Sequence, residues 1–259
     1  MSFSERYARG LVRRDMAAVA SSGERITRDF DRVLRHLFQV RCRDLDRRIR
    51  PKDFAAFRRQ LDGFRKEPAC TFFEADKTGK HDRIRIAYAL DSELAKIDEE
   101  KDETLYQERA ADHLFISITS DGRRFRVDDW STPSVISAHA LERYVARSLG
   151  EEVTPAALAR LSERASRSAL AYLRACTITN LSRTPSHCIA PFGDGLLLGY
   201  TVFTGTPPKG RHIIRDRHGV RTNMTEPPAR MAVAWRTFIT RDMLNATQQA
   251  TLEAIEPHL

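Results

Sequence analysis

Apolar residues recur at helical spacing in the first quarter of the chain. Between residues 25 and 49 they fall three or four positions apart, with arginines between them, which predicts an amphipathic helix. From Lys52 to Phe64 a shorter stretch carries four apolar residues on one stripe, and Pro68 discourages its continuation. The apolar positions are Ile26, Phe30, Val33, Leu34, Leu37, Phe38 and Leu45, then Phe54, Phe57, Leu61 and Phe64.

The middle of the chain has the period of two that is typical of strands. Residues 70–75, 83–90, 113–119 and 124–127 are expected to be strands, and within 83–90 the apolar residues Ile84, Ile86 and Tyr88 recur at a period of two. The stretch from Asp91 to Asp112 holds nine acidic residues. We expect residues 92–111 within it to be helical.

Two further helices are predicted after Pro133. Ser137 can cap a helix that ends near Gly150, and Pro155 suits the first turn of a helix that reaches about Arg174. Strands are expected at residues 187–190, 196–203 and 231–240, before a closing helix over residues 241–255.

These elements predict an α+β fold in two parts. Residues 1–130 combine a basic helical region with a small β-rich part. Residues 131–259 form a module of two helices and an antiparallel sheet, and the boundary is placed after Trp130, where the pattern changes.

The positive charge is concentrated at the N-terminus. The 259 residues carry a formal net charge of +8, whereas residues 1–66 alone hold 18 Lys or Arg against 9 Asp or Glu. Such a segment can follow nucleic-acid phosphates, and Arg28, Arg32 and Arg35 are its candidate ligands. A solvated helix face rich in arginine explains the same pattern equally well.

Composition and missing motifs exclude several classes of protein. No apolar run approaches the length needed to span a bilayer, and no secretory leader is expected at the N-terminus. Four scattered cysteines without a C-x-x-C pair favour a reducing, cytoplasmic location, with neither disulfides nor a metal. Phosphate-loop, nucleophile-elbow and zinc-helix motifs are absent, so no cofactor is expected.

The stretch from Ile136 to Arg147 carries the candidate chemistry. On a helix, His139, Arg143 and Arg147 share one polar stripe, opposite Leu141 and Val145. An imidazole can transfer protons and guanidinium groups can hold a phosphodiester, which are the requirements for metal-independent RNA cleavage. The same residues also suit a solvated helix face.

The run His139-Ala-Leu-Glu-Arg143-Tyr-Val-Ala-Arg147, followed by a helix and strands, resembles the RelE/barnase/EndoU/colicin-type ribonuclease-toxin superfamily. The resemblance covers about residues 134–245, and residues 1–130 have no counterpart in it. It implies a helical part packed on a curved antiparallel sheet. It also implies His139 and Arg143 as catalytic residues, with Arg147 one turn on and Thr237 or Thr240 as a hydroxyl on a late strand.

A second basic segment separates the last two strands. Residues 204–230 carry six Lys or Arg against two acidic residues, and Arg211, Arg215 and Arg217 are candidate nucleic-acid ligands there. Long connections in compact domains are usually functional or disordered. A solvated loop explains the composition as well as a binding flap does.

The sequence therefore predicts an RNA-binding, metal-independent ribonuclease-like protein, such as a bacterial toxin or effector. The alternative is a non-catalytic nucleic-acid-binding or protein-interaction module. A homodimer, in which the basic region docks on the acidic stretch of a second copy, or a cognate protein partner is also consistent with the charge pattern. No membrane partner is expected.

Overall fold

The computed structural model describes residues 3–42, 51–78, 81–98, 103–120, 125–147, 153–179, 188–204, 212–215 and 230–259. Within them the helices are α1 (Phe3–Cys42), α2 (Pro51–Asp62), α3 (Ala138–Arg147), α4 (Pro155–Thr179) and α5 (Ala246–Ile255). The strands are β1 (Cys70–Thr78), β2 (His81–Asp98), β3 (Glu103–Ser120), β4 (Phe125–Ser137), β5 (Cys188–Phe192), β6 (Gly195–Thr204), β7 (His212–Arg215) and β8 (Arg230–Ile239). The predicted α+β class is confirmed.

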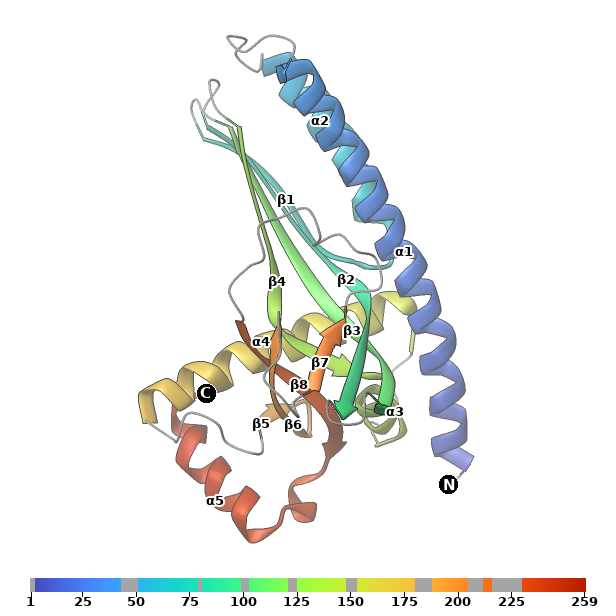
Figure 1. Ribbon diagram of the computed structural model, residues 1–259, viewed down its shortest axis with the longest axis vertical. Helices are drawn as coiled ribbons and strands as arrows, with labels where there is room; N and C mark the ends of the chain where they lie inside the picture. Colours follow the sequence, from blue (N-terminus) through green and yellow to red (C-terminus); the bar gives the residue numbers. More distant parts are fainter. Residues whose placement is uncertain are drawn as a thin grey trace.

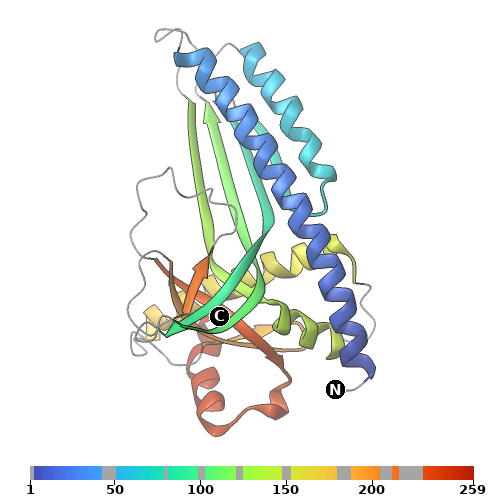
Figure 2. The same cartoon turned by 45° about the vertical axis from the view of Figure 1, so that its right-hand side comes forward.

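Helix α1 is much longer than the sequence pattern predicted. Its buried stripe begins at Ala8 and Val12 and continues through Met16 and Val19 at helical spacing, so the helix starts about six turns before residue 25. With 40 residues it extends for about 60 Å. It runs along the molecule from the N-terminus, and α2 returns beside its far end (Figures 1 and 2).

The strands form one sheet of mixed direction. Its order is β1-β2-β3-β4-β8-β6-β5, and β7 pairs with both β2 and β6. Strands β1 to β4 are antiparallel neighbours, and β8, β6 and β5 are antiparallel, as predicted for the C-terminal strands. The pairs β4–β8 and β6–β7 are parallel, which departs from the antiparallel sheet predicted for residues 131–259. Through β7, the strands β2, β3, β4, β8, β6 and β7 form a closed circuit of pairing.

The helix expected over residues 92–111 is wrong. Strands β2 and β3 continue through this stretch as a long antiparallel pair. Leu94 and Ala110 are fully buried on the strands, and Arg109 donates from Nε to Asp91 Oδ1 at 2.7 Å on the neighbouring strand. Burial does not alternate in the described part of this stretch, because Asp91 and Ser92, and Ala110 and Ala111, are buried in succession. The acidic composition therefore came without the period of two by which a strand is recognised.

The helix starts that were predicted from caps are confirmed. Ser137 Oγ accepts from the Ala140 N–H at 3.1 Å, and Thr154 Oγ1 accepts from the Ala157 N–H at 3.2 Å. Helix α4 nevertheless continues to Thr179, because its buried stripe extends as far as Ala175.

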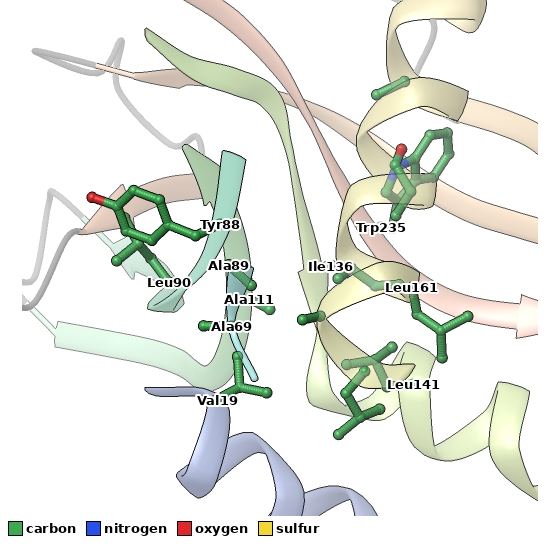
Figure 3. Packing of buried hydrophobic residues seen from close by; sticks show 14 of the residues in the cluster. Val19, Ala69, Tyr88, Ala89, Leu90, Ala111, Ile136, Leu141, Leu161 and Trp235 are labelled. Carbon is green, nitrogen blue, oxygen red and sulfur yellow. The ribbon is translucent and has the colours of Figure 1, made fainter. Parts of the chain in front are cut away.

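The main core joins the helices to the sheet. Val19 of α1, Leu141 of α3 and Leu161 of α4 converge with Leu90 and Trp235 of the sheet (Figure 3). The predicted boundary at residue 130 falls inside β4, which pairs with β3 on both sides of that residue and with β8 over residues 134–136. None of the helices in the described part of the chain is both long and apolar enough to cross a membrane.

Candidate functional site

Helix α3 presents the three residues of the predicted polar stripe. It buries Ala140, Leu141 and Tyr144. His139, Arg143 and Arg147 are all partly exposed. The predicted division of this helix into a packed face and a polar face is therefore confirmed.

Arg143 is held by a carboxylate from the other end of the sequence. Its Nη1 lies 2.5 Å from Oε1 of Glu5, in the first turn of α1. The two side chains keep 35% and 29% of their surface exposed. The guanidinium that the sequence assigned to a phosphate thus has an intramolecular partner that water can reach.

Both ends of α3 are bonded to strand β8. Ser137 Oγ donates to the Arg236 carbonyl at 3.1 Å, and Arg147 Nη1 donates to the Phe238 carbonyl at 2.5 Å. Thr237 lies between these two points. Because side chains alternate along a strand, Thr237 is on the opposite face from Phe238, whose ring packs edge-on against Tyr144 of α3.

The second hydroxyl candidate, Thr240, has a different environment. It follows β8 and precedes the short helix Arg241–Met243. A hydrogen bond with Thr240 lowers the pKa of the Asp242 carboxyl. Thr240 is therefore hydrogen-bonded to a residue two positions further along the chain.

Glu108 of β3 is a site residue that the sequence did not indicate. Its Oε1 accepts from the backbone N–H of His139 at 2.8 Å, and its Oε2 lies 3.6 Å from Arg236 Nε. A carboxylate at a helix N-terminus is favourable because the exposed N–H groups point at it. Glu108 thus occupies the position at the start of α3 where an anion would bind. Its place in a strand was hidden by the wrong assignment of residues 92–111.

Glu142 is a second carboxyl group that the sequence did not indicate. It lies one helical turn from His139, and Arg9 Nε approaches its Oε1 to 3.7 Å. Burial raises the pKa of Glu142, while the neighbouring Arg9, Arg13 and His139 act in the opposite direction. Its adjacency to an imidazole could have been noticed from helical spacing alone.

Another polar pair lies beside Glu108. Burial raises the pKa of the Tyr200 hydroxyl on β6, and the guanidinium of Arg236 opposes that shift. Together with Glu108, these residues link β3, β8 and β6 at the start of α3.

The first turns of α1 and the polar face of α3 form one cationic surface, which we call the α1–α3 surface. It contains Arg6, Arg9 and Arg13 of α1, His139, Glu142, Arg143 and Arg147 of α3, and Glu5. Arg6 and Arg13 are two helical turns apart on one side of α1, and both are exposed. Within the described part of the chain, neither makes a hydrogen bond or an ion pair.

The predicted ligands further along α1 are separate from this surface. Arg28 is exposed, and Arg32 pairs with Asp29 at 2.9 Å. Arg28 lies 15 residues beyond Arg13, or about 22 Å along the helix. The backbone of Arg35 continues α1, but its side chain lies outside the described residues.

The basic segment between the last two strands is described only in part. Arg215 ends β7, and its backbone pairs with Glu93 of β2. Arg211 and Arg217 lie outside the described residues.

The acidic stretch on which a second copy was expected to dock has two of its carboxyl groups in the interior of the fold. Asp91 and Asp112 are buried, and Asp91 pairs with Arg109 within the same chain. Among the residues with described side chains, no three His, Cys, Asp or Glu gather to hold a metal ion.

Comparisons with protein-family models, with curated proteins and with solved structures found no match to this chain. The α1–α3 surface is therefore the feature of the described residues from which we infer a function.

Proposed function

We propose that this protein binds single-stranded RNA through the α1–α3 surface, in the cytoplasm. The observation that supports the proposal is the juxtaposition of two basic segments about 130 residues apart in sequence. Five guanidinium groups, from Arg6, Arg9, Arg13, Arg143 and Arg147, outnumber the carboxylates near them in the described part of the chain. These are Glu5 and Glu142 on the surface, and Glu108 and Asp242 beside it. Arginine forks suit phosphate oxygens, and an excess of them attracts a polyanion without reading its sequence.

The test is a binding titration. A fluorescently labelled single-stranded RNA of 20 nucleotides is titrated with the full chain in EDTA, and anisotropy is followed at several salt concentrations. We expect saturable binding whose affinity falls steeply with salt, because each phosphate contact releases counterions. Absence of binding at 50 mM salt would rule the proposal out.

A second candidate function, RNA cleavage without a metal ion, is favoured by one pair of residues. His139 and Glu142 place an imidazole and a carboxyl of raised pKa one helical turn apart. In such a reaction one group accepts the proton of the ribose 2′-hydroxyl as its oxygen attacks phosphorus. The other protonates the departing 5′-oxygen, leaving a cyclic phosphate and a free hydroxyl. An RNA-cleaving activity of this kind would suit a toxin or effector.

Cleavage is measured separately from binding. RNA incubated with the protein in EDTA is analysed for cyclic-phosphate ends, using wild type, His139→Ala and Glu142→Gln. Loss of an acid or a base should slow cleavage about 100-fold or more. If wild type binds RNA and leaves it intact, or if His139→Ala cleaves at the same rate, the protein is a binding module only.

A further inference from the structure

The first turns of α1 lie directly against the polar face of α3. Ala8 and Val12 are buried along this part of α1. Glu5 pairs with Arg143 and, one turn later, Arg9 pairs with Glu142. The two ion pairs have opposite polarity, so they favour one orientation of α1 on α3.

Glu5 occupies the position beside the Arg143 guanidinium that a phosphate group would take. Carboxylate and phosphate oxygens are both good acceptors for a guanidinium, and both can take its two parallel N–H bonds. While Glu5 holds Arg143 at 2.5 Å, that guanidinium is engaged. RNA must compete for it with a group that belongs to the protein.

Glu108 differs from Glu5, although it too occupies an anion position on α3. Only 14% of its side chain is exposed, and both of its oxygens have neighbours in the His139 N–H and Arg236. Glu5 is about twice as exposed, and the ion pair with Arg143 holds its carboxylate at the surface. Glu5 is therefore the carboxylate that an incoming anion can displace.

We propose that Glu5 is a built-in competitor for the anion site at Arg143, and that it keeps this site closed until a phosphate of RNA displaces it. The inference rests on the proposed function, because the natural competitor is the RNA. Glu5 is then the residue that controls anion binding on the α1–α3 surface. The first turn of α1 sets how readily α3 takes part in binding.

The test uses a cycle of variants in the full chain. Glu5→Gln keeps the size of the side chain and removes its charge. A partly exposed ion pair contributes modestly, so we expect RNA affinity to rise about two- to fivefold. Arg143→Gln should weaken binding, and Glu5→Gln should then add nothing in the Arg143→Gln background. A gain that persists in that background would show a general charge effect and overturn the inference.

A second readout does not depend on RNA. Inorganic phosphate is titrated while the Nε–H resonance of Arg143 is followed by NMR. We expect the resonance to shift at lower phosphate concentration in Glu5→Gln than in wild type. Equal titrations overturn the inference.

The two measurements separate the inference from the proposed function. If neither protein binds RNA but phosphate shifts Arg143 more readily in Glu5→Gln, the proposed function fails, while Glu5 still competes for an anion site at Arg143. If RNA binds wild type and Glu5→Gln equally, the inference alone fails. Circular dichroism confirms that each variant keeps the helical content of wild type.

Discussion

At the scale of single residues, Arg143 lies on the polar face of α3 and is held by a distant part of the chain. Its partner, Glu5, lies 138 positions away in the sequence, and Glu108 reaches His139 across 31 positions. Such pairs depend on how α1 and β3 pack beside α3, which no local pattern encodes.

His113 gives a pH-dependent prediction. It is buried on β3, and its Nε2 lies 2.8 Å from Thr71 Oγ1. Burial lowers its pKa from 6.5 to about 4. Above pH 6.5 the imidazole is neutral in both folded and unfolded chains. As the pH falls from 6.5 to about 4, the unfolded chain takes up the proton first, and the folded state loses about 3 kcal/mol of stability.

Urea unfolding at pH 7 and pH 4.5 measures this loss. His113→Gln, whose amide can still bond Thr71, should show a smaller difference between the two pH values than wild type. His258→Gln is the control, because His258 is exposed at the end of the chain. An unchanged pH dependence in His113→Gln would contradict the account of this residue.

At the scale of elements, α1 packs on β2 with almost no space between them. A Cβ atom added to Gly23 would lie 2.5 Å from the Ala89 carbonyl oxygen and 3.3 Å from Leu90 Cδ2. The absence of a side chain at Gly23 is what lets the helix approach the strand. Gly10, in the same helix, has open space around it.

The two glycines predict opposite effects of the same substitution. Gly23→Ala should destabilise the fold by about 1–3 kcal/mol, because a backbone oxygen cannot move aside without shifting the strand. Gly10→Ala should stabilise it by up to about 1 kcal/mol, since alanine is the better helix former. Denaturant unfolding measures both. A neutral Gly23→Ala would mean that α1 is not seated on β2 as described.

Elements with a strong local signal were predictable. The caps at Ser137 and Thr154 located two helix starts because they are contacts between near neighbours. The stretch 92–111 was not predictable in the same way. Arg109 in this stretch pairs with Asp91 across the two strands, and composition alone does not reveal that arrangement.

At the scale of the whole molecule, the sheet joins the two predicted parts. The parallel pairing of β4 with β8 brings together residues about 100 positions apart. The short strand β7 links β2 to β6. Parallel pairing leaves no turn signature in the sequence, so this topology could not be derived from hydrophobic pattern.

The net charge of the molecule does not show where its basic residues lie or which of them are already paired. Of the basic N-terminal residues, Arg14, Arg25 and Arg32 pair with Asp15, Glu67 and Asp29. Arg6 and Arg13 remain available on the α1–α3 surface. We therefore expect RNA to bind at this end of α1.

The most direct test compares two double variants by the RNA titration across salt concentrations. Arg6→Ala/Arg13→Ala removes two charges from the α1–α3 surface. Arg59→Ala/Arg174→Ala removes two charges, also exposed, from α2 and from the C-terminal half of α4. We predict weaker binding only for the first pair, with a slope of log affinity against log salt smaller by about 1.4, since each phosphate contact on a single strand contributes about 0.7. Equal losses from the two pairs, or none from the first, would contradict the account.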